Sequence, residues 1–256
     1  MRRALIATLA LALAVGACGG NDDKHGTTAR QPLIVSAAAS LKDAFTAYGK
    51  DFAGADVRLS FAGSDELAAQ IRQGVKPDVF AAANTKLPDQ LYKEGLVERP
   101  TVFAGNELVI AVPANGSKVD SLDDLAARGT SLAIGAAGVP VGDYTRKVLG
   151  ALPAAQRKAI LGNVRSNEPD VKGVVGKLTQ GAVDAGFVYR SDVRAADDKL
   201  KAITLPSELE PKVAYGVAVV KGAKHAAQAR AFVRGLLDGA GAQALRAAGF
   251  LPPPTS

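Results

Sequence analysis

The sequence predicts an α/β fold in which most strands pair in parallel. Short apolar segments of strand length alternate with segments whose apolar residues recur at helical spacing, from about residue 33 to residue 249. This alternation is typical of α/β domains. The apolar fraction of 48% allows a sizeable core, and the length of the segment fits either one large domain or two lobes.

The first part of the domain is predicted to contain three strand–helix pairs. The expected strands are apolar or alternate between apolar and polar residues, and they lie at 33–37, 57–61 and 78–82. The helices that follow them have one apolar face each and lie at 41–52, 64–74 and 86–94. Gly74 and Gly95 end the second and third helices.

The second part continues the alternation with longer apolar strands. Ser121 with Asp124 three residues later is close to a capping box and predicts the start of a helix. The expected strands lie at 108–112, 132–136, 185–189 and 213–220. The other expected helices lie at 143–152, at 170–181 and within 226–249.

The N-terminus has the features of a secretion signal. Two arginines precede a mostly apolar stretch at 4–17, which is shorter than the about 20 residues of a membrane-spanning helix. Small residues precede Cys18, as in a bacterial lipobox, so we expect a lipoprotein signal peptide at 1–17 and lipidation of Cys18. The alternative is an ordinary signal peptide followed by a chance cysteine. Cys18 is the only cysteine, which excludes a disulfide framework.

The segments at the two ends of the domain and the net charge limit which partners the protein can have. Residues 18–31 are polar and without periodicity, as in a flexible tether, and the proline-rich tail at 251–256 cannot continue a helix. The net charge is +6, but acidic and basic residues are interleaved, which argues against a nucleic-acid partner. A weak positive field would instead help to gather anions.

The motifs of common enzymes and metal sites are absent from the sequence. The two histidines, His25 and His225, have no cysteine or acidic residue at convincing ligand spacing. No HExxH, CxxC, P-loop or GxSxG motif occurs. The sequence therefore shows no machinery for hydrolytic or redox chemistry and no ligands for a metal cation.

Four turns that lead into helices share small or polar residues, at 37–40, 61–64, 138–142 and 167–171. Ser40 and Ser64 are expected as N-caps of the helices that follow them. The first N–H groups of a helix lack intrahelical partners and bind anions well. Several such turns meeting at one point would hold a dianion without lysine or arginine, whereas plain helix capping explains each turn taken singly.

Six sequence blocks together resemble a known family. The blocks are AAASLKDAF from Ala37, FAGSDELAAQI from Phe61, PDVFAAAN from Pro77, VPVG from Val139, Asp170 with Val171, and GFVYRSD from Gly186. In this order they are similar to the ModA family, the molybdate-binding components of bacterial ABC importers. The resemblance covers about residues 33–250.

The resemblance implies a type II periplasmic binding protein fold, with two α/β lobes joined by crossing strands and the ligand between the lobes. Lobe 1 would comprise residues 32–107 and 214–250, and lobe 2 residues 108–213. By the family motif, Ser40 and Ser64 would donate hydroxyl and backbone hydrogen bonds to the ligand. Val141 and Val171 would donate backbone N–H groups, and Tyr189 its phenolic O–H.

A site of this kind suits a fully deprotonated tetrahedral dianion. Such an ion only accepts hydrogen bonds, whereas the proton of hydrogen phosphate would lack an acceptor in a site without a carboxylate. Asp65 departs from the family, which has a small or hydroxyl residue there. We expect its negative charge to interact favourably with the positive N-terminal end of the helix dipole. The alternative is that Asp65 faces the ligand and accepts a proton. Val141 stands where the family often has alanine, which leaves the backbone donor unchanged.

The resemblance thus implies an extracytoplasmic lipoprotein, anchored to the cell membrane through Cys18, that captures molybdate and also tungstate for ATP-driven import. Its partners would be an ABC permease with its ATPase, and we expect a monomer without cofactor or catalytic residues. Three alternatives stay open: a binding protein for sulfate or phosphate, an enzyme on the same two-lobed fold, and a sensor or adhesion module without a transport role.

Overall fold

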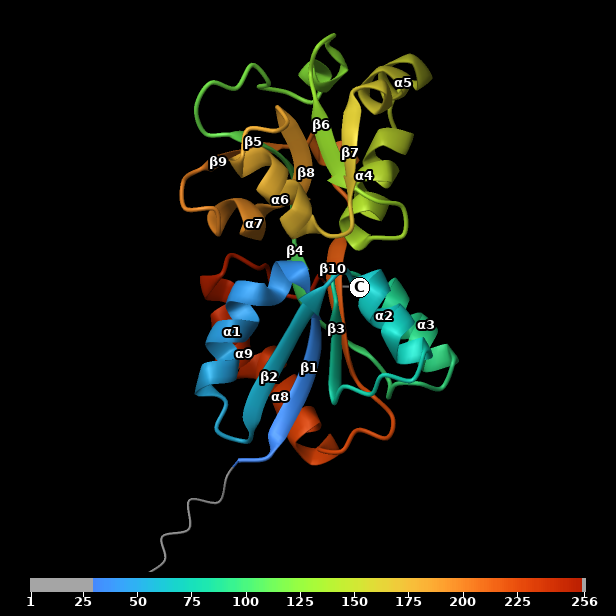
Figure 1. Ribbon diagram of the computed structural model, residues 1–256, viewed down its shortest axis with the longest axis vertical. Coiled ribbons are helices and arrows are strands. Elements are labelled where there is room, and N and C mark those ends of the chain that lie inside the picture. The colour runs from blue at the N-terminus through green and yellow to red at the C-terminus, as the bar shows by residue number, and fades with distance from the viewer. Residues whose placement is uncertain (1–29, 255–256) are drawn as a thin grey trace, which may run out of the picture.

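The computed structural model describes residues 30–254, which form two α/β lobes arranged along the long axis of the molecule (Figure 1). The predicted signal peptide, Cys18 and nearly all of the predicted tether lie outside the described residues, as do the last two residues of the tail. Within residues 30–254, no helix is both long enough and apolar enough to cross a membrane.

Each lobe is built on a five-stranded mixed sheet. The sheet of lobe 1 has the order β2-β1-β3-β10-β4 and comprises β1 (Pro32–Ala38), β2 (Asp56–Ala62), β3 (Val79–Ala82), β4 (Thr101–Asn106) and β10 (Val213–Val219). Its first three strands run parallel, and β10 is antiparallel to both of its neighbours. A sheet with this order requires helical crossovers between the parallel strands.

The sheet of lobe 2 repeats this plan. It has the order β7-β6-β8-β5-β9 and comprises β5 (Leu108–Pro113), β6 (Leu132–Gly135), β7 (Val164–Glu168), β8 (Ala185–Tyr189) and β9 (Leu200–Thr204). Strands β6, β7 and β8 are parallel, and β5 is antiparallel to β8 and β9. In both lobes the antiparallel strand is the one by which the chain enters from the other lobe.

Helices cover both faces of each sheet. Lobe 1 contains α1 (Lys42–Asp51), α2 (Ser64–Arg72), α3 (Lys86–Lys93), α8 (Ala226–Asp238) and α9 (Ala240–Ala247). Lobe 2 contains α4 (Pro140–Gly150), α5 (Ala154–Gly162), α6 (Val171–Thr179) and the short α7 (Arg190–Arg194). Three single 3-10 turns complete the described secondary structure, η1 (Ala39–Leu41), η2 (Asp123–Ala126) and η3 (Ser207–Leu209).

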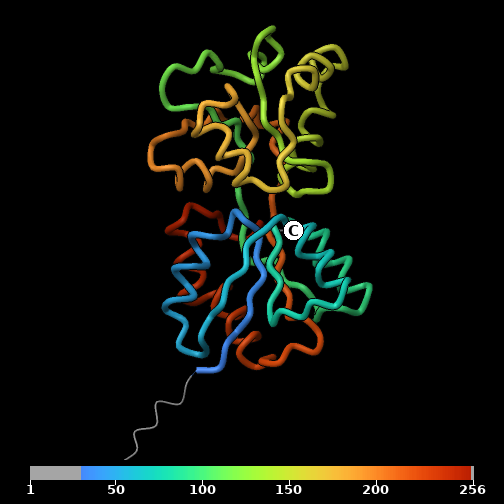
Figure 2. The backbone as a smooth tube through the Cα atoms, viewed as in Figure 1, coloured from blue at the N-terminus to red at the C-terminus, as the bar shows by residue number. Residues whose placement is uncertain are grey.

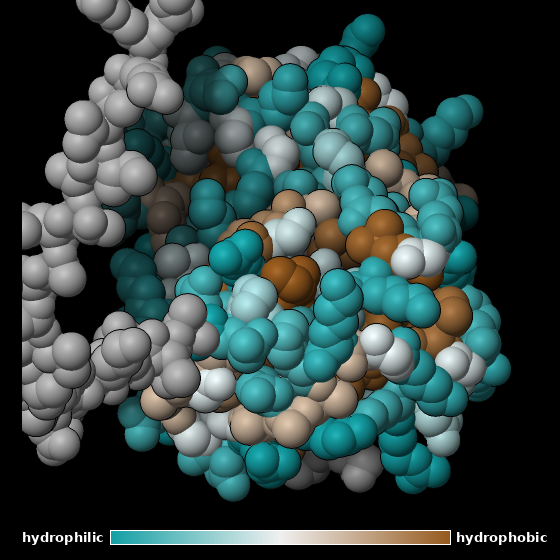
Figure 3. All heavy atoms as spheres, turned by 60° about the horizontal axis from the view of Figure 1, so that its bottom comes forward, coloured by the Kyte–Doolittle hydropathy of each residue, from teal (hydrophilic) through white to brown (hydrophobic). Residues whose placement is uncertain are grey.

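In the core of lobe 1, a tyrosine of α1 packs closely against α8. The rings of Tyr48 and Phe232 lie 4.5 Å apart, and the Tyr48 hydroxyl donates to the Phe232 carbonyl at 3.0 Å. A Cβ at Gly235 would lie 2.0 Å from the Tyr48 hydroxyl oxygen, so only glycine lets α8 approach α1 this closely. On the face of the molecule that Figure 3 shows, hydrophilic residues dominate and hydrophobic ones lie between them, as is normal for a solvent-exposed protein surface.

The chain crosses between the lobes twice, at Glu107 between β4 and β5 and at 205–212 between β9 and β10. The backbone tube shows the two crossings side by side at the waist of the molecule (Figure 2). Two short connections at one place are typical of a hinge, about which lobes can close. The predicted crossing strands β5 and β10 therefore start at this waist.

The strands at 33–37, 57–61, 78–82, 108–112, 132–136, 185–189 and 213–220 are confirmed, within one or two residues, as β1, β2, β3, β5, β6, β8 and β10. Three strands were not predicted, namely β4, β7 and β9, and all three lie at sheet edges. Edge strands are only partly covered, so their sequences lack a continuous apolar run. The helix predicted after Ser121 is only the 3-10 turn η2, although the predicted bond between Ser121 and Asp124 is present at 2.8 Å.

Candidate functional site

The carboxyl ends of six parallel strands point at one place between the lobes. Strands β1, β2 and β3 of lobe 1 and β6, β7 and β8 of lobe 2 each lead into a residue that lines the same pocket. In α/β sheets, ligands bind outside the carboxyl ends of the strands. The carboxyl ends of the parallel strands in the two sheets therefore face each other across the cleft.

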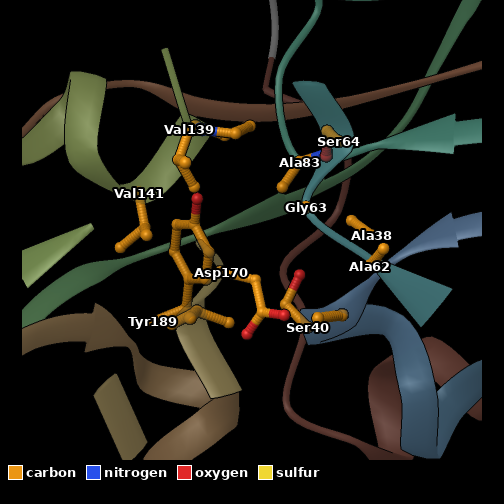
Figure 4. A pocket seen from close by; sticks show the side chains of 13 residues that line it. Ala38, Ser40, Ala62, Gly63, Ser64, Ala83, Val139, Val141, Asp170 and Tyr189 are labelled. Carbon is orange, nitrogen blue, oxygen red and sulfur yellow. The ribbon is translucent and has the colours of Figure 1, made fainter. Parts of the chain in front are cut away.

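The pocket is small, with a volume of about 10 Å³, which is about the space that one water molecule needs. Its lining is Ala38, Ala39, Ser40, Ala62, Gly63, Ser64, Ala83, Val139, Pro140, Val141, Asp170, Val171 and Tyr189. Tyr189, Val139 and Val141 face Ser40, Ser64 and Ala83 across the pocket (Figure 4). All five residues predicted as ligand-binding thus line one small space, which the sequence alone could not show.

Helix N-termini supply much of the pocket wall. Helix α2 begins at Ser64, α4 at Pro140 and α6 at Val171, and the 3-10 turn η1 contains Ser40. The first N–H groups of these segments have no partner within their own helix, and the helix dipoles are positive there. Because Pro140 has no N–H group, the first donor of α4 is that of Val141. The geometry thus brings neutral N–H donors of both lobes to one point.

The prediction that Ser40 and Ser64 are N-caps is wrong. Gly63 is the N-cap of α2, and the 3-10 turn places Ser40 before Leu41, the N-cap of α1; neither serine makes a capping bond. Instead, Ser64 Oγ accepts a hydrogen bond from the Ala83 N–H at 3.0 Å, and Ser40 Oγ lies 3.0 Å from the Tyr215 hydroxyl. The serine hydroxyls are therefore tied to neighbouring strands and not to their own helices.

The bond from Ala83 determines what Ser64 can do in the pocket. A backbone N–H only donates, so it occupies an acceptor position of the Ser64 hydroxyl and leaves the Ser64 proton free. Ser64 is 1% exposed and lines the pocket. Ser64 is thereby prepared as a hydrogen-bond donor.

Tyr189 provides an unpaired donor at the wall of lobe 2. Its side chain is 1% exposed, and its hydroxyl makes no hydrogen bond of normal geometry among residues 30–254, although the Tyr215 hydroxyl is a close neighbour. Burial, followed by the nearby Tyr215, raises the pKa of Tyr189 well above its ordinary value, so the phenol stays protonated at neutral pH. A buried hydroxyl without a partner is costly, and a hydrogen-bond acceptor in the pocket would relieve this cost.

Asp170 adds a feature that the expectation of a site without carboxylates did not include. It is the N-cap of α6, its Oδ1 accepts the Gly173 N–H at 3.0 Å, and it lines the pocket. No lysine, arginine or histidine is among the described lining residues, so Asp170 is the only charged group there. By contrast, Asp65 is not among the lining residues, although it follows Ser64 directly.

The lobes touch at several points around the pocket. A Cβ at Gly63 of lobe 1 would lie 2.5 Å from the carbonyl oxygen of Pro169 in lobe 2. Two ion pairs also cross the cleft, each with an N···O distance of 3.5 Å: Lys86 with Asp143, and Asp43 with Lys172. These charged side chains are largely exposed, so each pair contributes little to the free energy of closure.

A buried carboxylate supports the Tyr189 wall from behind. Asp192 is 1% exposed, accepts the Tyr189 N–H at 3.3 Å and lies 3.3 Å from Lys172 Nζ. Burial raises the pKa of Asp192 to about 6, although the ammonium of Lys172 opposes this shift. Asp192 therefore connects two predicted site residues. It accepts the backbone N–H of Tyr189 and pairs with Lys172, which follows Val171 in the chain.

The sequence analysis assigned no role to several of these residues, for identifiable reasons. Gly63 lies within the FAGSDELAAQI block and Asp192 within the GFVYRSD block, but the contact of Gly63 with Pro169 and that of Asp192 with Lys172 arise only in the folded chain. Asn106 and Tyr215 carry no local signal, because Ser191 and Ser40, which they contact, lie far away in the sequence. Among residues 30–254 there is no cluster of three or more histidine, cysteine, aspartate or glutamate side chains that would hold a metal ion.

Comparison with known proteins agrees with this geometry. The family of bacterial extracellular solute-binding proteins matches residues 33–251. The molybdate-binding protein ModA of Mycobacterium tuberculosis H37Rv is 36% identical over 247 residues, which cover 93% of this chain and 92% of the relative. The putative ABC transporter substrate-binding lipoprotein YvgL of Bacillus subtilis is 30% identical, covering 89% of each chain.

The fold is also similar to a solved structure. The periplasmic molybdate-binding protein of Azotobacter vinelandii superposes with a TM-score of 0.78 at 22% identity, covering 87% of this chain and all of that one. Two lobes with a small pocket between them define a solute-binding protein of the type II periplasmic class, as predicted. The chain belongs to the bacterial extracellular solute-binding proteins and, among them, to the ModA family.

The pKa of Asp192 predicts a pH dependence of stability. Because its folded-state pKa of about 6 lies above the ordinary value of 3.8, this group contributes stability that is complete below pH 3.8 and lost as the pH rises through 6. In Asp192→Asn, which keeps an acceptor for the Tyr189 N–H, this loss should vanish. Urea denaturation of both proteins between pH 4.5 and 7 measures it, and parallel stability curves would contradict the assignment.

Proposed function

We propose that this protein captures molybdate, and also tungstate, and delivers it to an ABC permease that a cytoplasmic ATPase drives. The pocket supports this proposal, because it offers convergent neutral donors and no cationic side chain. Hydrogen bonds to a charged group contribute roughly 1.5–3 kcal/mol each, so a few of them suffice for tight binding. The names of the M. tuberculosis and A. vinelandii relatives support the same ligand.

The proposal also covers cofactors, oligomeric state, catalysis and location. The protein acts without a cofactor and as a monomer. It is a binding component and not an enzyme. Its site lies outside the cytoplasm, and a lipid on Cys18 anchors it to the cell membrane, for which the lipobox-like sequence and the lipoprotein name of the B. subtilis relative are the support. The weakly basic net charge favours the approach of anions.

Titration calorimetry with four oxyanions tests the ligand class. Molybdate and tungstate should bind most tightly, and sulfate more weakly because its smaller size does not let its oxygens reach all the donors at once. Hydrogen phosphate should also bind more weakly, because its proton needs an acceptor and the described lining offers one carboxylate, Asp170, whose Oδ1 already accepts the Gly173 N–H. Tighter binding of phosphate than of molybdate at neutral pH would refute the proposal.

The same titration on five variants tests the assignment of the donors. Ser40→Ala, Ser64→Ala and Tyr189→Phe each remove an O–H donor and should weaken molybdate binding about 10- to 100-fold. Val141→Ala and Val171→Ala keep the backbone N–H and should bind almost as tightly as the natural protein. Melting temperatures without ligand serve as the folding control, and equal losses in all five variants would reject the assignment.

Closure of the lobes around the ion is part of the proposed mechanism, since donors of both lobes must reach it together. Gly63→Ala places a methyl group against the Pro169 carbonyl of lobe 2 only when the lobes are closed, whereas its contact with Asp65 Oδ1, 2.8 Å away in lobe 1, is present whether the lobes are open or closed. The melting temperature without ligand measures the cost of the Asp65 contact, and the Pro169 contact should in addition weaken molybdate binding about tenfold or more. An unchanged affinity would show that the lobes do not need to approach this closely.

A further inference from the structure

We propose that Tyr215, held by Asn106, is a positioning residue that turns the Ser40 hydroxyl into an obligate donor and thereby selects oxyanions without a proton. This inference rests on the proposed function and deepens it. Neither residue lines the pocket, and both lie at the waist of the molecule, Asn106 at the end of β4 and Tyr215 within β10.

The contact between Tyr215 and Ser40 is buried and close. The two oxygens lie 3.0 Å apart, Tyr215 is fully buried, and Ser40 is 5% exposed. The residues are 175 positions apart in the sequence, so the second crossing between the lobes brings the tyrosine behind the serine. With water excluded, each hydroxyl depends on the other and on a few neighbours for its hydrogen bonds.

Asn106 determines the direction of this bond. Its Oδ1 accepts the backbone N–H of Glu107 at 2.9 Å, and since a backbone N–H only donates, the orientation of the amide is fixed. The amide nitrogen of Asn106 therefore faces its other partners as a donor, namely Ser191 Oγ at 2.8 Å and the Tyr215 side chain. The amide nitrogen can only donate, so we infer that the Tyr215 oxygen accepts from it.

Two hydroxyls, those of Ser40 and Tyr189, are then neighbours of the Tyr215 proton, and Ser40 Oγ is the one at normal hydrogen-bond geometry, 3.0 Å away. Burial, followed by the charge of Asp192, raises the pKa of Tyr215 well above its ordinary value, so this proton is present at neutral pH. The donor chain runs from Asn106 to Tyr215 to Ser40, and the Ser40 proton is left for the pocket. Successive bonds in such a chain polarise one another and strengthen the last donor.

The hydroxyls of Ser40 and Ser64 are therefore both oriented to donate into the pocket, but different groups orient them. Ser64 is set by the backbone N–H of Ala83, which no substitution of a side chain reverses. Ser40 is set by a side chain, and without the Tyr215 hydroxyl it would be free to accept. A Ser40 hydroxyl that accepts would suit the P–O–H group of hydrogen phosphate and not the oxygens of molybdate or sulfate.

A double-mutant cycle with molybdate, sulfate and phosphate as titrants tests this. Tyr215→Phe should weaken molybdate and sulfate binding about fivefold, the value of one ordinary hydrogen bond, and should leave phosphate binding unchanged or tighter. In the Ser40→Ala background, Tyr215→Phe should have no further effect, because its action passes through that hydroxyl.

Tyr48→Phe is the matched control. It removes an equally buried tyrosine hydroxyl, which donates to Phe232 away from the pocket, and it should leave all three affinities unchanged. If Tyr215→Phe does not fold, Asn106→Leu replaces it. This neutral side chain removes the donor to Tyr215, so the Tyr215 oxygen becomes free to accept from Ser40, and molybdate binding should weaken only when Ser40 is present.

The outcomes separate the two proposals. If the natural protein binds none of the oxyanions, the proposed function is wrong, and the inference about Tyr215 is wrong with it. If the natural protein binds molybdate but Tyr215→Phe weakens molybdate and phosphate equally, or acts equally with and without Ser40, the proposed function stands. The assignment of Tyr215 is then overturned, because the tyrosine acts only through packing.

Discussion

The proposed function places one requirement on the rest of the structure, namely that fixed neutral donors replace the hydration shell of a small anion. An ion that leaves water loses a large solvation free energy, and only well-placed hydrogen bonds or opposite charges recover it. The described pocket lining contains no cation, so N–H and O–H groups must carry the interaction. Six parallel strands that end at one point satisfy this requirement, because each places a turn or a helix N-terminus there.

The division of the donors between two lobes connects binding with motion. Ser40 and Ser64 belong to lobe 1, whereas Val141, Val171 and Tyr189 belong to lobe 2, so the pocket is complete only when the lobes meet. The small residues Ala62 and Gly63 allow this approach, and the exposed ion pairs across the cleft add little to it. Closure would therefore be stabilised mainly by the captured ion, which is what a protein that must later release its cargo requires.

The sequence predicted the parts of this arrangement that depend on local patterns. Buried strands were recognised from their apolar runs, whereas the edge strands β4, β7 and β9 were missed because half-covered strands have mixed sequences. Ser40 and Ser64 were placed correctly at strand–helix turns but were given the wrong partners, since Ala83 and Tyr215 reach them only in the folded chain. Tyr215 and Asn106 have no pattern of their own, because their roles arise from distant contacts, and the GFVYRSD block that contains Asp192 does not reveal its contact with Lys172.

A crystal structure of the protein grown with tungstate tests the central claim most directly, because the heavy atom scatters anomalously and marks its own position. We predict one tungsten site between the lobes, with its oxygens within hydrogen-bond distance of the hydroxyls of Ser40, Ser64 and Tyr189 and of the N–H groups of Val141 and Val171. An empty pocket, or a tungstate held by lysine or arginine side chains elsewhere, would contradict the account.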